Sequence, residues 1–425
     1  MNRPFKLRDD LLLGVATAST QIEGGDTNNN WYRWTKNGDK THDGSNCLRA
    51  NRHYEYYVED IELMKKMGLE TYRFSLEWSR IEPSEGEFSQ EAMEHYIDEI
   101  KHLLAAGIKP LITLHHFSNP LWFEDKGAFL YKKNNHYFDK YVRFVGENLK
   151  DLAHEYCTIN EPNVYAVNCY LFGEWVNEIK SLSKCCKVLK NLALCHINAY
   201  RILHQIDPLA NVGFANHQQY FVPQRKHNLM DKIAAHIYNQ GFNDSITKAM
   251  GWGKFTWPIG CGLFSKKKGV FLDYIGLNYY TSNEVRGAKL IANPLYPKND
   301  LGWAICPEGI AVLSKRLHDL FHKDVYITEN GTCDYKDSFR SQYIYDHLVM
   351  IKDLPFVKRY YYWTFFDNFE WKEGEAICFG LIQYDYETEA KTPRKSCRFY
   401  EDIIKNKGIT QNMLDTYIKK EGYVK

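Results

Sequence analysis

The sequence predicts an α/β fold in which eight parallel strands alternate with helices, a (β/α)8 or TIM barrel built as a single domain over residues 1–425. Short apolar runs alternate with longer stretches of helical periodicity along the whole chain. Such alternation is typical of parallel strands joined by helical crossovers. No linker, low-complexity tract or change of composition interrupts the pattern, and this continuity favours one closed barrel over several smaller domains.

Eight apolar or β-branched runs are expected to form the strands. Several of them are apolar throughout, as is typical of strands buried on both faces of a parallel sheet. The first run resembles a secretory signal, but Asp9 and Asp10 lie against it and it is short for export, so a buried strand is the preferred interpretation. The eight expected strands are 11–18, 69–76, 110–116, 155–160, 212–217, 273–280, 324–329 and 359–366.

Helical patterns separate these strands. Apolar residues recur three and four positions apart over 58–67 and 93–104, and each set forms one stripe along a helix. Gly68 and Gly107 follow the two stripes, at the position where a left-handed turn ends a helix. Further helices are expected over 136–150, 184–205, 229–249, 307–322, 338–352 and 396–406.

An open, doubly wound sheet is the alternative fold for this pattern. That fold would place a glycine-rich phosphate-binding turn directly after the first strand. The first strand runs instead into Thr17-Ala18-Ser19-Thr20-Gln21, which contains no glycine. The closed barrel is therefore preferred.

Composition narrows the classes of partner. The formal net charge is +1, so no strong electrostatic field favours nucleic acid or an anionic membrane, and the basic run at 266–268 is interpreted as a solvated loop. No apolar run approaches the roughly 18 residues of a membrane span. The eleven cysteines show neither CxxC pairs nor metal-ligand spacing, which indicates reduced thiols in a cytoplasmic protein. The oligomeric state is left open.

Polar and aromatic residues gather at the ends of the expected strands, where barrel enzymes carry their active sites. Carboxylates, amides and aromatic rings that arrive together indicate a cleft that binds hydroxyl groups and stacks on a flat ring. The residues concerned are Gln21, Glu23, Arg73, His115, His116, Asn160, Glu161, Asn278, Tyr280, Glu329, Asn330, Trp363, Glu370 and Trp371.

Glu161 and Glu329 are distinctive because each ends an apolar strand and precedes a turn, marked by Pro162 and by Gly331. Two carboxyl groups across a cleft are what cleavage of a glycosidic bond requires. One protonates the departing oxygen, and the other attacks the anomeric carbon or supports its positive charge. Either glutamate alone is equally compatible with a structural salt bridge, but the pair favours catalysis.

Two motifs resemble those of glycoside hydrolase family 1. Thr158-Ile159-Asn160-Glu161-Pro162 is similar to the acid/base motif of that family, and Ile327-Thr328-Glu329-Asn330-Gly331 is similar to its nucleophile motif. The resemblance covers nearly the whole chain, because further family motifs follow in family order. They are Gln21-Ile22-Glu23-Gly24, Tyr72-Arg73-Phe74-Ser75, Thr113-Leu114-His115-His116, Gly276-Leu277-Asn278-Tyr279-Tyr280 and Asp367-Asn368-Phe369-Glu370-Trp371.

The resemblance implies a retaining, exo-acting β-glycosidase that acts on a small-molecule β-glycoside, with Glu329 as nucleophile and Glu161 as acid/base. It implies no cofactor and no metal, and His115-His116 lacks companion ligands for zinc. Because Glu161 is protonated in one step and ionised in the next, we expect a bell-shaped pH profile, and retention predicts carboxyl groups about 5 Å apart.

The remaining site residues take family roles by the same resemblance. Arg73 and Tyr280 are expected to flank the nucleophile, where an arginine should favour its ionised form. Asn278 is expected near Glu161 and the sugar, and Trp363 beneath the sugar as an apolar platform. His115 is interpreted as a packing residue. The hydroxyls of the sugar in subsite −1 are expected to bind Gln21, His116, Asn160, Glu370 and Trp371.

The chain departs from the family pattern in three places. Cys378 replaces an arginine of a common Arg-Phe-Gly-Leu run, which puts the anchoring of that loop in doubt. Phe117 replaces a frequent tryptophan beside the sugar-binding histidine, which predicts a smaller wall without an indole N–H. The segment 170–175 lacks the expected proline-rich continuation. The aglycone side of the cleft is therefore the least predictable part.

The Glu370-Trp371 pair bears on the substrate. Relatives that act on 6-phosphorylated sugars carry a Ser/Lys/Tyr phosphate pocket there, and an anionic Glu370 would repel phosphate. We therefore expect unmodified terminal β-D-glucosides, either cellobiose-like or alkyl and aryl glucosides, with β-galactosides left open. Lys372 is interpreted as solvent-facing. The alternatives are a 6-phospho-β-glycosidase, a transglycosylase, a catalytically silent sugar-binding barrel and a metal-dependent hydrolase.

Overall fold

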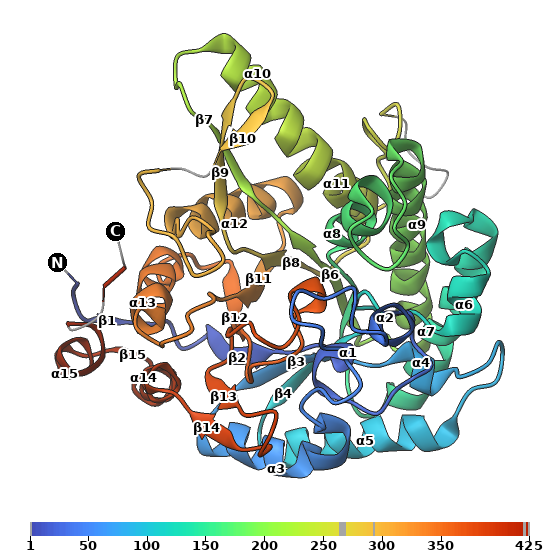
Figure 1. Cartoon of the computed structure of the whole chain (residues 1–425), viewed down its shortest axis with the longest axis horizontal. Coiled ribbons are helices and arrows are strands. Elements are labelled where there is room, and N and C mark those ends of the chain that lie inside the picture. Colours follow the sequence, from blue (N-terminus) through green and yellow to red (C-terminus); the bar gives the residue numbers. More distant parts are fainter. Residues whose placement is uncertain (1, 263–268, 292–293, 420–421, 424–425) are drawn as a thin grey trace.

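The computed structural model describes residues 2–262, 269–291, 294–419 and 422–423, so the basic run at 266–268 lies outside the described residues. Eight parallel strands close into a barrel, which confirms the predicted fold class (Figure 1). In barrel order the strands are β2 (Leu12–Ala16), β3 (Thr71–Ser75), β4 (Lys109–Thr113), β5 (Glu155–Asn160), β6 (Asn211–His217), β8 (Tyr274–Asn278), β11 (Asp324–Asn330) and β12 (Val357–Trp363).

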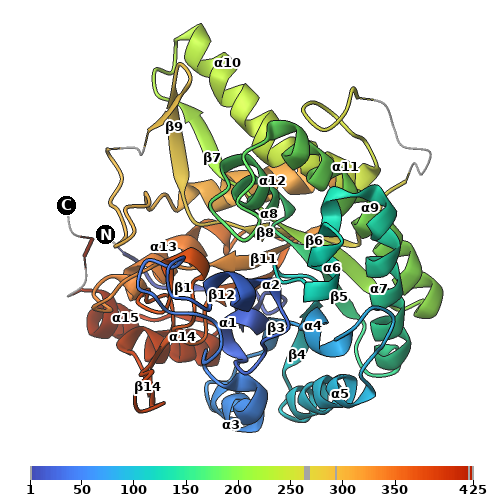
Figure 2. The ribbon, with the colours of Figure 1, turned by 45° about the vertical axis from the view of Figure 1, so that its right-hand side comes forward.

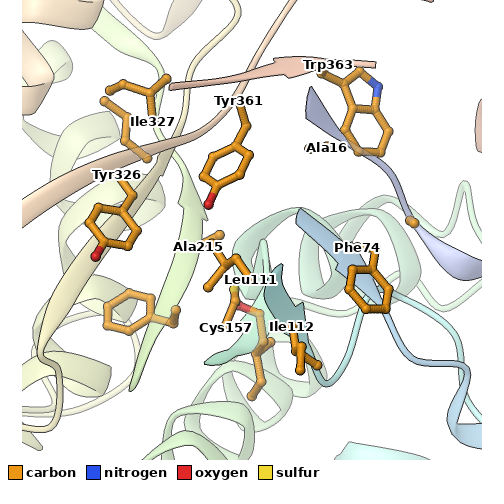
Figure 3. Packing of buried hydrophobic residues seen from close by; sticks show 14 of the residues in the cluster. Ala16, Phe74, Leu111, Ile112, Cys157, Ala215, Tyr326, Ile327, Tyr361 and Trp363 are labelled. Carbon is orange, nitrogen blue, oxygen red and sulfur yellow. The ribbon is translucent and has the colours of Figure 1, made fainter. Parts of the chain in front are cut away.

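The closure is made by β12 and β2, which pair in parallel from Arg359 with Leu12 to Trp363 with Ala16. Each of these strands coincides with an expected strand to within a few residues. The interior is packed: the described side chains of the strands are buried on both faces almost throughout, as the continuous apolar runs indicated. Figure 3 shows Leu111 and Tyr361, from β4 and β12, reaching into the same interior space.

Helices surround the barrel (Figures 1 and 2). The principal ones are α3 (His53–Lys66), α5 (Gln90–Ala105), α7 (Asn135–Leu149), α9 (Leu182–Ile206), α12 (Glu308–Phe321), α13 (Arg340–Ile351) and α14 (Lys395–Asn406). They agree with the expected helices. The shorter helices α1 (Ser19–Ile22), α2 (Asn30–Thr35), α4 (Trp78–Ile81), α6 (Leu121–Asp125), α8 (Pro162–Ala166) and α15 (Gln411–Met413) lie in the connections.

The helix expected over 229–249 is divided. It forms α10 (Leu229–Tyr238), a π-helical turn η4 (Asn239–Asp244) and α11 (Ser245–Trp252). Asn243 is fully buried in this turn, and its Nδ2 donates to the Gln219 carbonyl and to Asn239 Oδ1, both at 2.9 Å. These side-chain bonds hold the wider turn, which the apolar periodicity alone did not indicate.

Three small sheets accompany the barrel and were not expected. The strands β7 (Tyr220–Pro223), β9 (Ser282–Arg286) and β10 (Lys289–Ile291) form one of them, in the order β10-β9-β7. Figure 2 shows this sheet and α10 rising from the barrel. The pairs β1 (Phe5–Lys6) with β15 (Gly408–Ile409) and β13 (Ile382–Tyr384) with β14 (Lys391–Pro393) form the others. Their strands are too short to show a period in the sequence.

An ion pair connects β12 and β5 near their N-terminal ends. Arg359, near the start of β12, is 5% exposed and forms an ion pair with Glu155, the first residue of β5. All eleven cysteines are unpaired. Among the described residues, none of the helices has the length and apolar character needed to span a bilayer.

Candidate active site

All eleven predicted site residues come together above the C-terminal ends of the barrel strands. Hydrogen bonds and ring contacts connect them into one group, in which Asn278 bonds Asn160 and Gln21 bonds Glu370. Gln21 lies in α1 after β2, and Arg73 lies within β3. The others follow or end strands β4, β5, β8, β11 and β12, namely His116, Asn160, Glu161, Asn278, Tyr280, Glu329, Trp363, Glu370 and Trp371.

Glu329 is held at both carboxylate oxygens. Arg73 Nη1 donates to Oε1 at 2.6 Å, and the Tyr280 hydroxyl donates to Oε2 at 2.5 Å. Arg73 is fully buried and Glu329 is 3% exposed, so the ion pair is shielded from water. Burial raises the pKa of Tyr280 well above its usual range, which keeps its phenol protonated and able to donate.

The ionisation of Glu329 reflects opposing effects. Burial raises the pKa of Glu329 to about 7, and the nearby charge of Glu161 adds to the rise. Arg73 and Tyr280 oppose burial and lower the pKa. Arg73 thus lowers the pKa of Glu329, as expected. The net shift is still upward, because burial of the carboxylate raises the pKa by more than Arg73 lowers it.

Gly331, two residues after Glu329, permits the close approach of β11 and β12. A Cβ placed on Gly331 would lie 1.8 Å from the carbonyl oxygen of Trp363. Any larger residue would therefore separate the strand that carries Glu329 from the strand that carries Trp363.

Glu161 is held at one oxygen only. Asn278 Nδ2 donates to Glu161 Oε1 at 2.8 Å, and His217 Nδ1 lies 3.2 Å from the same oxygen. Within the described part of the chain, no hydrogen bond goes to Oε2. Glu161 also has a φ of +42°, a left-handed conformation that is unfavourable for a residue with a side chain and that is typical of functional sites.

A chain of amides orients the groups between the two glutamates. Arg73 Nη2 donates to Asn160 Oδ1 at 2.6 Å, so the amide nitrogen of Asn160 must point away from the arginine. That nitrogen lies 2.9 Å from His116 Nε2, which therefore accepts. Burial lowers the pKa of His116 well below its usual range, and the neutral ring then carries its proton on Nδ1.

Two buried polar atoms in this group have no hydrogen-bond partner among the described residues. They are His116 Nδ1, a donor by the reasoning above, and Gln21 Oε1, an acceptor. The Gln21 amide is fixed because its Nε2 donates to the Phe369 carbonyl at 2.8 Å. These two atoms, one donor and one acceptor, are therefore available for hydrogen bonds to a bound molecule.

Aromatic rings form one wall of the cleft. The His116 ring lies 5.9 Å from the rings of both Trp363 and Trp371, at interplanar angles of 28° and 24°. Phe117 packs on Trp371 at 5.2 Å, and Trp175 packs on Phe117 at 5.1 Å. The smaller Phe117 is thus backed by an indole from the segment 170–175, a residue that the sequence reasoning did not select.

Glu370 is partly buried beside Trp363, whose indole Nε1 donates to Glu370 Oε1 at 3.1 Å. Burial in the cleft raises the pKa of Glu370 to about 8, the Trp363 bond lowers it, and the charge of Glu329 raises it. The argument that an anionic Glu370 repels phosphate is therefore weakened, because the carboxyl group is largely protonated at neutral pH. Lys372 pairs with Glu174 at 3.6 Å and not with Glu370.

The loop that carries Cys378 is anchored without the missing arginine. Arg340 Nη2 donates to the Cys378 carbonyl at 2.8 Å, and Arg394 bonds the Gly380 carbonyl at 2.9 Å. Arg394 also forms an ion pair with Asp367 at 2.6 Å. Arg340 and Arg394 therefore anchor this loop in place of the arginine that family members carry at position 378.

His115 packs as expected. Its Nε2 lies 3.0 Å from Asn119 Oδ1, and its ring contacts Phe129 and Tyr165 edge to face. His217, in contrast, was missed, although it is the last residue of a correctly predicted strand. Its position at a strand end is the signal that could have found it. Among the described residues, no group of three His, Cys, Asp or Glu side chains is arranged to hold a metal ion.

Comparison with known proteins gives consistent matches over the length of the chain. The family model described as "Glycosyl hydrolase family 1" matches residues 4–409. Among curated proteins, Beta-glucosidase A of Acetivibrio thermocellus is 30% identical over 94% of this chain and 98% of its own length. Beta-glucosidase A of Thermotoga maritima is 28% identical over 95% and 99% of the two chains.

Solved structures agree with these matches. A "beta-glycosidase from Pyrococcus horikoshii" superposes with a TM-score of 0.90 at 36% identity, over 98% of both chains. A "Beta-glucosidase from Thermotoga maritima in complex with glucoimidazole" superposes with a TM-score of 0.88 at 27% identity, over 95% of this chain and 100% of that one. The resemblance found in the sequence motifs is confirmed.

Proposed function

The chain belongs to glycosyl hydrolase family 1, and we propose that it is a retaining, exo-acting β-glycosidase that hydrolyses terminal β-D-glucosides. The observation that carries the proposal is the unlike surroundings of two carboxyl groups in one cleft. Glu329 binds Arg73 and Tyr280 through both oxygens, whereas Glu161 keeps one oxygen free of protein partners among the described residues. Two carboxyl groups with different environments are what acid/base and nucleophile roles require.

In the first step, Glu329 attacks the anomeric carbon as the bond from that carbon to the aglycone oxygen breaks. Glu161 transfers its proton to the departing oxygen, and the aglycone leaves as an alcohol. The products are the free aglycone alcohol and an α-linked glycosyl ester on Glu329. Arg73 lowers the pKa of Glu329 against the effect of burial and so maintains an ionised nucleophile.

In the second step, the ionised Glu161 takes a proton from water while the water oxygen attacks the anomeric carbon. The ester bond to Glu329 breaks, and the sugar leaves with its β configuration restored. Both enzyme groups return to their initial protonation states. A separation of about 5 Å between the two carboxyl groups remains a prediction of this scheme.

Recognition of the sugar in subsite −1 is assigned to the atoms that the protein leaves unpaired. Gln21 Oε1 would accept from a sugar hydroxyl, and His116 Nδ1 would donate to one. Glu370, protonated near neutral pH, can both donate and accept. Trp363 supplies the apolar platform. Asn160, oriented by Arg73, and Trp371, stacked beside His116, complete the proposed binding set.

Glucosides are preferred because several relatives carry the name beta-glucosidase. Galactosides differ at one hydroxyl, and Glu370 can bond either epimer. A 6-phospho-β-glycosidase is the second candidate, since the protonation of Glu370 reduces the repulsion of phosphate. It is disfavoured because the nearby Lys372 is paired with Glu174. A transglycosylase would use the same glycosyl ester, with an alcohol in place of water.

The wider assignments follow as parts of the same proposal. We propose one catalytic domain over residues 1–425 and a small-molecule β-glycoside as the partner. The unpaired cysteines support a reducing, cytoplasmic environment.

The test compares nitrophenyl β-D-glucoside with its 6-phosphate, for the wild type and Glu329→Gln. We expect the wild type to turn over the plain glucoside. The substitution should reduce kcat by at least about 10⁴-fold, because an amide cannot form the glycosyl ester. Turnover of the phosphate alone would contradict the substrate assignment. A Glu329→Gln variant with wild-type kcat would contradict the mechanism.

A further inference from the structure

We propose that His217 is a positioning residue for the acid/base, which donates a hydrogen bond from Nδ1 to Glu161 Oε1 and thereby keeps the transferable proton on Oε2. The inference rests on the proposed function, since it concerns the proton that Glu161 moves. It also concerns a residue that the sequence motifs did not indicate.

The fold brings His217 to this place through strand register. His217 is the last residue of β6 and pairs with Asn278, the last residue of β8. The Glu161 backbone N–H bonds the Ala215 carbonyl of the same strand β6 at 2.8 Å. Adjacent strand ends therefore direct the His217 ring and the Asn278 amide to one oxygen of Glu161, at 3.2 and 2.8 Å.

The direction of the His217 bond follows from the partners of Glu161. Thr328 Oγ1 donates to Asn278 Oδ1 at 2.6 Å, which leaves the Asn278 nitrogen as the atom that faces Glu161. When Glu161 is ionised, both of its oxygens accept, so His217 Nδ1 must carry a proton. Two donors on Oε1 leave Oε2 as the oxygen that receives a proton from water and delivers it to the aglycone.

The His217 ring is held for this role. It lies 5.7 Å from the Tyr280 ring at an interplanar angle of 16°, and Phe242 contacts it edge to face at 5.8 Å. Asn163 Nδ2 donates to the His217 carbonyl at 2.7 Å and fixes its backbone. Because Tyr280 also bonds Glu329, one ring stack connects the groups that support the two glutamates.

The charged and titratable groups around this pair are few. Phe242 of η4 and Asn163 of α8, which contact His217, carry no charge. Tyr280 after β8 stacks on the His217 ring, and Glu329 on β11 interacts with the charge of Glu161. Arg73 on β3 and His116 after β4 lie one step further away, bonded to Glu329 and to Asn160. Replacing His217 leaves all four in place, so a change in the pH profile reports on the lost donor.

The test uses two substitutions that separate the donor from the ring. His217→Phe keeps the stack on Tyr280 and removes the donor. His217→Asn removes the stack, but its amide nitrogen occupies the place of Nδ1 and can donate. The measurement is kcat/KM for nitrophenyl β-D-glucoside against pH. Its alkaline limb reports the loss of the acid proton from the free enzyme.

We expect His217→Phe to move the alkaline limb upward by about one pH unit, because a hydrogen bond that favours the ionised form is lost. His217→Asn should keep the limb at its wild-type position, whatever its rate. His154→Phe is the matched control. It removes a histidine–carboxylate contact, His154 to Asp207 at 2.6 Å, at the opposite end of β5 and β6, and should leave the limb unmoved.

An unmoved limb in His217→Phe, with an active wild type, would overturn the inference while the proposed function stands. Equal shifts in His217→Phe and His217→Asn would overturn it too, because they would assign the effect to packing. A second donor-free variant, His217→Leu, replaces the phenylalanine if that protein does not fold. A wild type without turnover of any β-glycoside would overturn the proposed function, and the inference would fall with it.

Discussion

The two sides of the cleft hold the same kind of side chain in different ways. On the side formed by β3, β8 and β11, Glu329 binds a guanidinium and a phenol, one at each oxygen. Glu161 follows β5 and binds the Asn278 amide, at the end of β8, and the His217 imidazole, at the end of β6, both at Oε1. In the proposed mechanism, the partners and not the residue type distinguish the nucleophile from the proton carrier.

The electrostatic cost also differs between the two sides. Glu329 is buried enough that its pKa rises to about 7 even with Arg73 beside it. A group whose pKa is raised is ionised only above that value, so the nucleophile side should set the acid limb of the pH profile. The acid/base side, where a proton must be present at the start, should set the alkaline limb.

The largest effect is expected from breaking the acid/base side with Glu161→Gln. Turnover of an alkyl β-glucoside should fall by up to about 10⁴-fold, because its alkoxide cannot leave without a proton. Dinitrophenolate can leave from its β-glucoside without that proton, so the glycosyl ester should still form. The ester should then accumulate, because the second step lacks its base. Stopped-flow release of dinitrophenol would show a burst. Equal losses for both substrates would contradict the acid role.

Breaking the nucleophile side through Arg73→Met should reduce kcat/KM at neutral pH by about 10²–10³-fold. Arg73 lowers the pKa of Glu329, so its loss raises that pKa above about 7 and leaves less ionised nucleophile at pH 7. The acid limb of kcat/KM should therefore move to higher pH, which a pH–rate profile measures directly.

Arg359→Met is the matched control for this comparison. Arg359 is also buried and paired with a glutamate, but at the N-terminal ends of the strands. Its loss should lower the melting temperature and leave the acid limb in place. An acid limb that moves in both variants, or in neither, would contradict the role assigned to Arg73.

The smallest effect is expected from Tyr280→Phe, which sharpens the comparison without removing a charge. The lost hydrogen bond to Glu329 Oε2 should reduce kcat/KM by about tenfold. It should also move the acid limb upward by less than Arg73→Met does, since Tyr280 lowers the pKa of Glu329 less than Arg73. A downward shift of the limb would contradict the donor role of the phenol.

Much of the barrel was predictable because its strands are buried on both faces. Apolar or β-branched runs marked the eight strands, several of them apolar throughout, and single apolar stripes marked helices such as α3 and α5. The sheet of β7, β9 and β10 was not predictable from the same signals. Its strands are short and partly exposed, and its small core is formed by Phe221, Ala235 and Val285, which are distant in the sequence.

The membership of the site was predictable, because residues at strand ends meet at one end of a parallel barrel whatever the details of packing. His217 was not predicted as a site residue, although the strand that it ends was predicted, because no sequence motif includes it. The orphaned atoms of Gln21 and His116 also needed the structure, because a tautomer depends on which atom each neighbour presents.

The sequence by itself determined the eight-fold alternation, the two glutamates at strand ends and the family, because these are encoded in local period and in contiguous motifs. Only the tertiary structure decided how burial and neighbouring charges shift the pKa of Glu329, and which oxygen of Glu161 has no protein partner among the described residues. Those properties depend on Arg73 of β3, on His217 of β6, and on Asn278 and Tyr280 at the end of β8. Electrostatic and hydrogen-bond energies follow distances of a few ångströms in space, and the order of residues along the chain does not specify such distances.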